Sequence, residues 1–336
     1  MKKTLVRILS AALAGLLLLT GCFRKKANAD NASMEGMTAG EIISMKHPTE
    51  PDMVVDGVGY VRREDLTTLL LMGIDKSGDL ETTRKDQGGQ CDVLLLLVLD
   101  GKNRTQTILQ LDRDTMTEVE ILDLRGKSTG ITRVQPICIS HAYGPGDEKS
   151  CENTVRAVSR LLLDIPIDGY AAILYEAIPD LNDTVGGIEV TIEDDFSASD
   201  PSLVKGETLT LKGKQALTYV RGRMTVADGT NTNRMKRQRN YLNTFGKKVR
   251  SMVLTNSSVI NDLVAAAEPY LTTDMTLSQL SSAALEGAGY ADGGILTTSG
   301  EHTQTVNPNG TCATEFYADE ESILQNVLTL FYEPLG

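Results

Sequence analysis

The sequence predicts an α/β protein, an α-β-α sandwich with a mixed central sheet. Residues 93–99 form a continuously apolar run with valines near its ends, which is typical of a strand buried on both faces. Residues 234–252 carry apolar side chains at the spacing of one helix face. Strand-like and helix-like segments are mixed along the chain, which favours helices packed on a sheet.

The remaining elements follow the same two periodicities. Strands are expected where short apolar runs end in turn residues, and helices where apolar positions recur three or four residues apart. Residues 293–311 are rich in Gly, Thr and Asn and predict a surface loop. The other expected strands are 68–72, 107–111, 169–174 and 188–192, and the other expected helices are 153–163, 175–185, 213–220, 259–271, 277–285 and 320–332.

Two of the expected strands are joined by a turn sequence, Asp100-Gly-Lys-Asn103. A hairpin centred near Lys102 and Asn103 would place Asp92 opposite Arg113 at the open end of the sheet. This acid–base pair has two interpretations. It is either a surface ion pair contributing about 0–1 kcal/mol or part of a functional site.

Positive charge is concentrated in one segment of an acidic chain. The formal net charge is −12, yet from Arg221 to Arg250 there are nine Lys or Arg residues and a single acid, Asp228. Clustered arginines bind phosphates or carboxylates, because the guanidinium group contacts two oxygens at once. The alternative is a solvated basic helix face. The acidic balance and the low aromatic content (4%) argue against nucleic-acid binding.

Gln238 interrupts the apolar stripe of the helix expected at 234–252. Arg234 lies four residues earlier and therefore on the same side of the helix. A buried amide beside an arginine needs polar partners. These are either an anionic ligand or an internal network with Asp or Glu from the sheet.

The N-terminus has the features of an export signal. Basic residues precede an apolar stretch at 8–20, which is shorter than the ~20 residues that span a bilayer. The stretch ends in Leu19-Thr-Gly-Cys22, which resembles a bacterial lipobox. We expect a lipoprotein signal peptide at 1–22 with lipidation of Cys22, a flexible tether at 23–64, and a domain at the extracytoplasmic face of the cell membrane. An uncleaved single membrane helix is the rival interpretation. Export permits disulfides, and Cys138 and Cys151 are candidates for one.

Several further segments follow one another in a characteristic order. They are Leu70-Leu-Met-Gly-Ile-Asp75, Cys91-Asp92, Arg113-Asp-Thr115, His141-Ala-Tyr-Gly144, Asp183-Thr-Val-Gly-Gly-Ile-Glu-Val190, Leu211-Lys-Gly-Lys-Gln-Ala-Leu-Thr-Tyr-Val-Arg221-Gly-Arg223 and Arg234-Met-Lys-Arg-Gln238. Together they resemble the LytR-CpsA-Psr family of extracytoplasmic phosphotransferases. The resemblance covers about residues 66–245. It implies one catalytic domain at 65–336, with a motif-bearing core at 66–250 and C-terminal helices and a loop at 251–336.

The resemblance implies a function. Family members transfer a glycopolymer of teichoic acid or capsule type from a polyprenyl-pyrophosphate carrier to peptidoglycan. The lipid lies in an apolar pocket between sheet and helices, and Mg²⁺ assists. By position, Asp75 and Asp92 would be metal ligands or acid/base groups. The pyrophosphate-binding residues would be Arg113, Arg221, Arg223, Arg234, Arg237 and Gln238.

The chain also departs from the family pattern. Asn231 stands where the family often has Asp, and Asn cannot act as a base, so Asp228 nearby is expected to replace it. Two rival functions use the same residues or the same fold. One is a pyrophosphatase that acts on the lipid carrier with water as acceptor. The other is a non-catalytic regulator that binds wall polymer or lipid.

Overall fold

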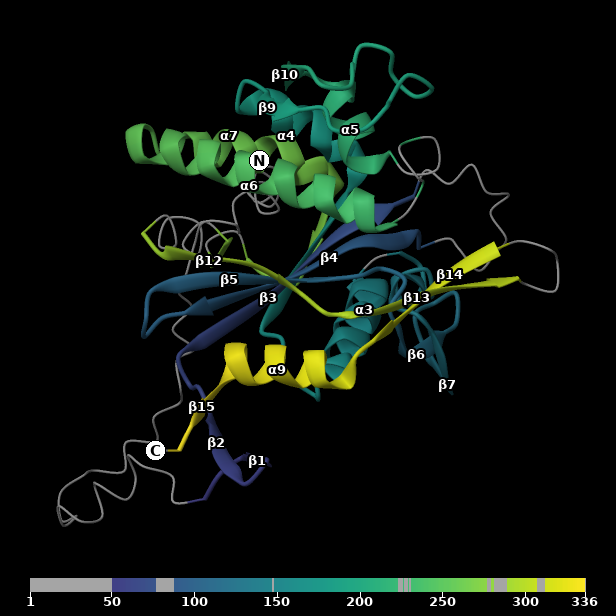
Figure 1. The fold of residues 1–336 in the computed structure, drawn as a ribbon, viewed down its shortest axis with the longest axis vertical. Coiled ribbons are helices and arrows are strands. Elements are labelled where there is room, and N and C mark those ends of the chain that lie inside the picture. The colour runs from purple at the N-terminus through teal and green to yellow at the C-terminus, as the bar shows by residue number, and fades with distance from the viewer. Residues whose placement is uncertain are drawn as a thin grey trace, which may run out of the picture.

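A mixed six-stranded sheet lies at the centre of the protein (Figure 1). The computed structural model describes residues 50–76, 88–146, 148–222, 226, 229, 231–276, 279–280, 289–306 and 312–335. Strand β3 is parallel to β8 and β5 is parallel to β12, whereas the other neighbours are antiparallel. In order across the sheet the strands are β11 (Leu271–Thr273), β8 (Gly169–Leu174), β3 (Leu66–Asp75), β4 (Gln90–Asp100), β5 (Thr105–Leu111) and β12 (Ala291–Thr297).

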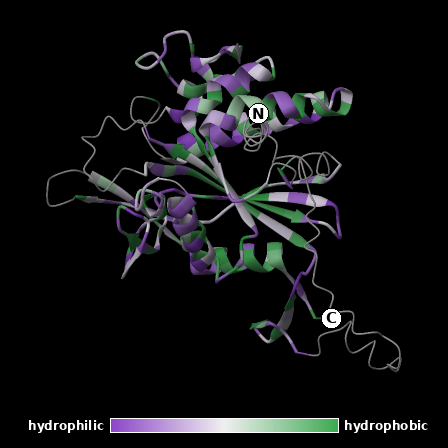
Figure 2. Ribbon diagram, turned by 180° about the vertical axis from the view of Figure 1, so that it is seen from behind, coloured by the Kyte–Doolittle hydropathy of each residue, from purple (hydrophilic) through white to green (hydrophobic). Residues whose placement is uncertain are grey.

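Helices cover both faces of the sheet, which confirms the predicted α-β-α sandwich (Figure 1). Successive residues of β3 alternate between the two layers: Leu69 and Leu71 belong to one core cluster, and Leu70 and Met72 to another. Figure 2 shows hydrophobic residues along the central strands. One layer contains α4 (Ile178–Thr184), α5 (Lys214–Arg221), α6 (Asn231–Thr255) and α7 (Val259–Ala267), and the other contains α3 (Glu148–Leu161) and α9 (Glu320–Phe331).

The hairpin formed by β4 and β5 has the predicted register. Its ladder runs from Leu94 opposite Leu111 to Asp100 opposite Thr105, so Asp92 and Arg113 lie just beyond its open end. On the other side of β4, the pairing with β3 shifts by one residue at Asp92. A bulge of this kind redirects a side chain and is common beside functional sites.

Several peripheral elements differ from the prediction. Within the expected tether, β1 (Met53–Val55) and β2 (Val58–Arg62) form a hairpin, and β2 pairs with β15 (Tyr332–Pro334). The loop prediction at 293–311 is wrong for most of its length, because β12 and β13 (Gly300–Val306) occupy it, and β13 pairs with β14 (Cys312–Ala318). Strand β13 is exposed at nearly every position, so it lacks the apolar alternation that predicts a strand.

Two further strand pairs complete the fold. The hairpin of β6 (Met116–Leu122) and β7 (Ser128–Pro136) was not predicted, and β7 is mostly exposed. Strand β9 (Ile188–Thr191) pairs with β10 (Thr208–Leu211). The helix expected at 259–271 ends as α7 at Ala267, and the 3₁₀ helix Glu268–Tyr270 follows it, because Pro269 has no N–H group to continue the α-helical hydrogen bonds.

Some predictions fall outside the described residues. The signal peptide at 1–22 does so entirely, and the helix expected at 277–285 does so for most of its length. Within the described ranges, no helix combines the length and the apolar character needed to cross a membrane.

Candidate functional site

Arg113 and Asp92 form a buried ion pair at the end of the sheet. The Arg113 Nη1 group donates to Asp92 Oδ1, as the hairpin register predicted. The two side chains are 12% and 5% exposed, so the interpretation as a surface ion pair is wrong. The Nη2 group of Arg113 donates to Gln90 Oε1 and to Cys138 Sγ, the latter at 3.1 Å. Its Nε atom lies 3.2 Å from Asp114 Oδ1.

A second arginine reaches Asp92 from the helical layer. Arg234, in the first turn of α6, donates from Nη1 to Asp92 Oδ2 at 2.8 Å, and its side chain is 3% exposed. Each oxygen of Asp92 therefore contacts a different arginine. This contact joins the sheet to the helix that carries most of the basic segment.

Asp75 and Arg221 form a more open pair at the same end of the sheet. Asp75 is the last residue of β3, and its cross-strand partner is Gln90 on β4, two residues before Asp92. Arg221, the last residue of α5, binds both oxygens of Asp75 at 3.0 Å. The arginine side chain is 37% exposed and the aspartate 18%. Two predicted carboxylates and three predicted arginines thus lie together.

The electrostatics of the cluster favour charged arginines. Burial by itself lowers the pKa of Arg113, but the adjacent Cys138, Asp92 and Asp114 have the larger combined effect, and the pKa ends above its ordinary value. The guanidinium group therefore stays protonated at every physiological pH. It is a fixed positive charge available to an anionic ligand.

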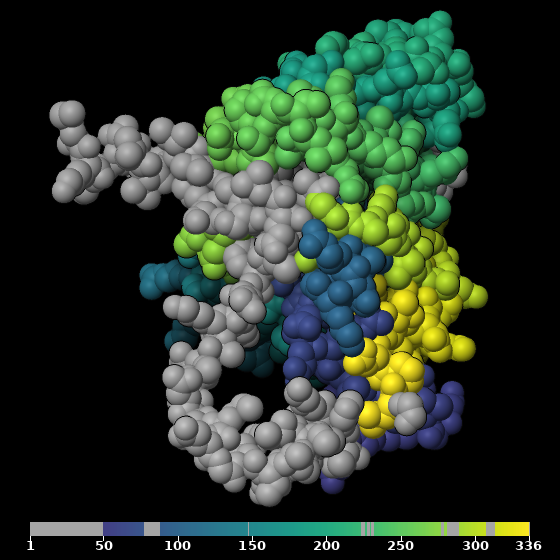
Figure 3. All heavy atoms as spheres, turned by 90° about the vertical axis from the view of Figure 1, so that its left-hand side faces the viewer, coloured from purple at the N-terminus to yellow at the C-terminus, as the bar shows by residue number. Residues whose placement is uncertain are grey.

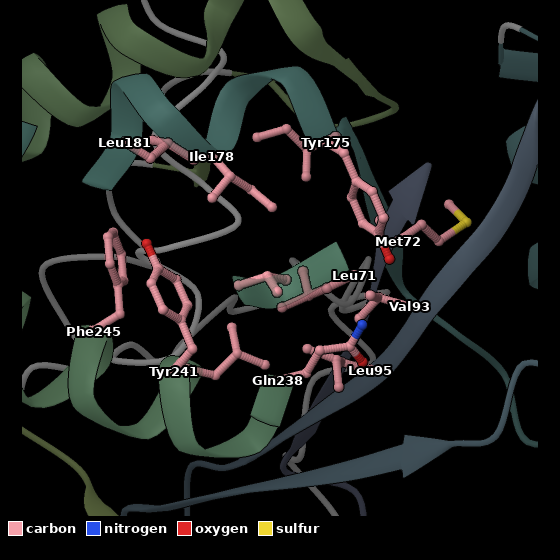
Figure 4. A pocket seen from close by; sticks show the side chains of 14 residues that line it. Leu71, Met72, Val93, Leu95, Tyr175, Ile178, Leu181, Gln238, Tyr241 and Phe245 are labelled. Atoms are coloured by element: carbon pink, nitrogen blue, oxygen red, sulfur yellow. The ribbon is translucent and has the colours of Figure 1, made fainter. Parts of the chain in front are cut away.

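An apolar pocket lies between the sheet and the helical layer, as the resemblance to the family implied (Figure 4). Its volume is about 100 Å³. Its walls are mostly aliphatic and aromatic side chains of β3, β4, α4 and α6. The lining includes Leu71, Met72, Val93, Leu95, Ile178, Leu181, Tyr241 and Phe245.

Two polar groups in this pocket lack hydrogen-bond partners. They are the Gln238 Nε2 amide and the Tyr175 hydroxyl, both on side chains that are 2% exposed. In Figure 4 they point toward the same part of the pocket, beside Val93. Burial raises the pKa of Tyr175, and the charge of nearby Asp92 raises it further, so the phenol remains a neutral donor. A buried donor without a partner is unfavourable and indicates a missing acceptor.

Not every predicted residue joins the cluster. Arg237 is 3% exposed and is held internally: Nη1 donates to Asp194 at 2.6 Å, and other groups donate to the carbonyls of Tyr219 and Gly222. Its guanidinium also lies 5.4 Å from the ring centroid of Phe196. Arg237 fixes the segment before α6, and we leave it out of the candidate site. Arg223, Asp228 and Cys22 lie outside the described residues.

Cys138 and Cys151, the candidates for a disulfide, are not bridged. Among the described cysteines, Cys91, Cys138 and Cys151 are all buried thiols without a disulfide. Cys138 instead contacts Arg113, and Cys151 Sγ lies 3.6 Å from His141 Nε2. Burial raises the pKa of Cys138 to about 11. The Cys138 thiol is therefore a neutral group packed beside the arginine cluster.

Sequence reasoning missed three residues at the site. Gln90 and Cys138 were not expected to contact Arg113, because one lies outside the predicted strand and the other in a short 3₁₀ helix, Ile137–Ser140. Tyr175 was placed in a helix without a role. The sequence signal that could have identified it is its position directly after a buried strand. A tyrosine there can pack its apolar ring in the core and direct its hydroxyl group to a polar partner.

The sequence matches a known protein family over most of its length. The model of the LytR_cpsA_psr family matches residues 26–330. The chain belongs to the LytR-CpsA-Psr family. Biofilm regulatory protein A of Streptococcus mutans is 31% identical over 70% of this chain and 56% of its own length, so the chain spans little more than half of that relative. The polyisoprenyl-teichoic acid–peptidoglycan teichoic acid transferase TagU of Bacillus cereus is 30% identical over 69% of each chain.

A solved structure supports the fold. Protein gbs0355 from Streptococcus agalactiae has a TM-score of 0.60 and 22% sequence identity, covering 79% of this chain and 86% of that one. The mixed sheet with helices on both faces is thus a fold that this LytR-CpsA-Psr protein shares with a distant structural neighbour.

Proposed function

We propose that this protein transfers a glycopolymer of teichoic acid or capsule type from a polyprenyl-pyrophosphate carrier to peptidoglycan. Membership of the family and the likeness to a protein named as a teichoic acid transferase support the reaction class. The observation that carries the proposal is the position of Tyr175. Its side chain lines the apolar pocket, and its hydroxyl lies within the field of Asp92, Arg234, Arg113 and Asp75. An apolar chamber therefore ends beside a cluster of arginines, which suits a lipid with a pyrophosphate head.

Binding would proceed by an exchange of partners. Arg113 and Arg234 now contact the carboxylate of Asp92, and their donors have the geometry that phosphate oxygens require. Pyrophosphate oxygens in place of the carboxylate would also give the Gln238 amide an acceptor. The exchange releases a carboxylate in the centre of the site.

The reaction follows from this arrangement. The acceptor hydroxyl oxygen forms a bond to the phosphorus that carries the glycopolymer, and the bridging P–O bond of the pyrophosphate breaks. Polyprenyl phosphate leaves with that electron pair, and a carboxylate, Asp75 or Asp92, takes the hydroxyl proton. The arginines stabilise the charge that develops on the phosphoryl oxygens, which is the main demand of phosphoryl transfer.

We propose that Mg²⁺ takes part, because the residues present suit it. Asp75 and Asp92 come from neighbouring strands at one end of the sheet, and Mg²⁺ prefers one or two carboxylates together with phosphate oxygens. No cluster of three or more potential ligands occurs in the described part of the chain. The substrate together with one or both aspartates would hold the ion, which would neutralise pyrophosphate charge, and an aspartate that does not hold it would accept the proton.

The same proposal includes the location. The signal-like segment ending at Cys22 supports anchoring of the protein by lipid at the extracytoplasmic face of the membrane. Mass spectrometry of the membrane-bound protein tests this directly. Acylation at Cys22 is the expected result, and an unmodified residue Met1 would indicate a membrane helix instead.

A reconstituted reaction tests the function. The full chain is incubated with a polyprenyl-pyrophosphate oligosaccharide, soluble peptidoglycan fragments and Mg²⁺, and the products are identified by mass spectrometry. We expect a phosphodiester-linked adduct that Arg221→Met abolishes. The control is Lys236→Gln, which alters an exposed residue of α6 paired with Glu193. Polyprenyl phosphate without an adduct would indicate a pyrophosphatase. Tight lipid binding without either product would indicate a binding protein.

A further inference from the structure

A second pocket lies against an adjacent side of α6. It has a volume of about 50 Å³ and is enclosed by α6, β5 and β12. Leu242 lines both pockets, so α6 is their common wall. Figure 3 shows this side of the molecule, with the green helical layer above β12 and β5. The lining is mixed: Gln106, Asn243, Lys247, Arg250 and Asp292 are polar, whereas Ile108, Leu242 and Ile295 are apolar.

A buried amide oxygen at this pocket lacks a partner. Gln106 on β5 is 7% exposed, and no hydrogen-bond donor reaches its Oε1 atom. Gln110, two residues further along the same face of the strand from Ile108, shows the contrasting case, because Arg239 Nη1 donates to its Oε1 at 2.8 Å. An unsatisfied buried acceptor indicates a ligand with a hydroxyl or N–H group.

The backbone of β12 leaves room beside Gln106. Asp292 pairs with Gln106 and Ile295 with Ile108, so the two glycines between them form a bulge. A Cβ at Gly293 would lie 2.2 Å from Thr107 Oγ1. Gly294, which lines the pocket, has φ +83° and has no atom within 4 Å of an added Cβ. Glycine inside a strand often marks a place where a ligand approaches.

The charges at the rim favour an anion. Lys247 is exposed and Arg250 half-buried, and neither forms an ion pair with another described residue. Lys236, on a different side of the same helix, is instead paired with Glu193 at 2.7 Å. The carboxylate of Asp292 adds an acceptor next to these donors. A mixed set of donors and acceptors without aromatic rings suits a ligand rich in hydroxyl groups.

We propose that this pocket binds an anionic saccharide. A sugar hydroxyl or acetamido N–H donates to Gln106 Oε1, and a carboxylate or phosphate of the saccharide contacts Lys247 and Arg250. Its role rests on the proposed function, as a subsite for one of the two glycans in the reaction. Thirteen helical residues separate Lys247 from Arg234, or about 20 Å. A saccharide bound here is therefore several sugar units away from the reacting phosphate.

Direct binding measurements on the full chain test the proposal without any need for transfer. The first probe is a soluble peptidoglycan glycan strand freed of its stem peptides, so that its muramic acid units carry free carboxylates. The second is an oligosaccharide of the donor polymer with its phosphates, free of lipid. A neutral chitin oligosaccharide of equal length is the control ligand, and Lys236→Gln is the control variant.

Two variants carry the test. Gln106→Met keeps the shape of the side chain and removes the unsatisfied amide, so we expect an equal or higher Tm and an affinity lower by about threefold to tenfold. Reversal of charge by Lys247→Glu with Arg250→Glu should lower affinity for the anionic saccharide by at least about tenfold. Binding of the neutral oligosaccharide should change much less on charge reversal.

The outcomes separate the possibilities. Loss of affinity for the glycan strand assigns the pocket to the acceptor, and loss for the phosphate-bearing oligosaccharide assigns it to the donor. Unchanged affinity for both probes in both variants overturns the proposal, as does an equal loss in Lys236→Gln. If the unmodified chain binds a glycan but transfers nothing, the proposed function fails while this inference stands.

Discussion

Replacement of Arg113 by Met, compared with the same change at Arg221, tests whether the stability of the fold and the transfer activity depend on the arginine cluster in different ways. Methionine keeps much of the side-chain volume and removes the charge. Because Arg113 is 12% exposed and Asp92 5%, the variant leaves a buried carboxylate with Arg234 alone, and Asp114 also loses its nearby cation. Removing one partner of a buried ion pair costs about 3–5 kcal/mol. For a domain of this size, that corresponds to a Tm lower by about 6–20 °C.

Arg221→Met is the matched control. Arg221 is 37% exposed, and its partner Asp75 lies near solvent, so the loss of this pair costs about 0–1 kcal/mol. Both variants should lose transfer, because each removes a donor to the pyrophosphate. Thermal unfolding and the transfer assay are measured on the same preparations. Equal stability losses in the two variants would refute the reasoning that burial decides the cost. Full transfer activity in either would remove that arginine from the site.

Three further predictions follow from buried polar groups. Gln238→Met removes an unpartnered amide, so we expect the free energy of unfolding to stay equal or to rise by about 1 kcal/mol. The rate of transfer should fall by about tenfold or more. A clear loss of stability would show that the amide has a structural role. Asp92→Asn should weaken the dependence of turnover on Mg²⁺, and an unchanged metal titration would reject Asp92 as a ligand. Cys138 has a pKa raised by burial from 9.0 to about 11, so the unfolded chain ionises first as pH rises. Stability should therefore fall between about pH 9 and 11, by on the order of 2 kcal/mol, and this fall should shrink in Cys138→Ala.

The sequence predicted the layers and the central hairpin because both have strong local signals. A run of apolar residues followed by a turn sequence predicts strands β4 and β5 and their register. The register in turn predicts the contact between Asp92 and Arg113. Arg234 was predicted to lie at the site because it shares a helix side with Gln238, a buried amide in an apolar stripe. These inferences needed only periodicity and the cost of burying polar groups.

The remainder depends on contacts that no local pattern records. Arg237 lies in the same basic run as Arg234, but the helix turns its side chain toward Asp194 and the carbonyl of Gly222. Residues three apart lie on nearly the same face of a helix, so helical periodicity could not separate the roles of Arg234 and Arg237. Only their tertiary partners, Asp92 and Asp194, distinguish them. The thiol of Cys138 likewise could not be assigned to Arg113 until the sheet had brought them together.

The charge balance of the cluster explains why a divalent cation belongs to the proposed reaction. Among the described residues, Arg113, Arg221 and Arg234 are matched by Asp75, Asp92 and Asp114. A pyrophosphate diester brings about two further negative charges into this neutral cluster. The three described arginines can change partners, but they do not neutralise these carboxylates and the pyrophosphate together. The proposed divalent cation, bound with the substrate, would supply positive charge and would allow a released aspartate to remain ionised as the proton acceptor.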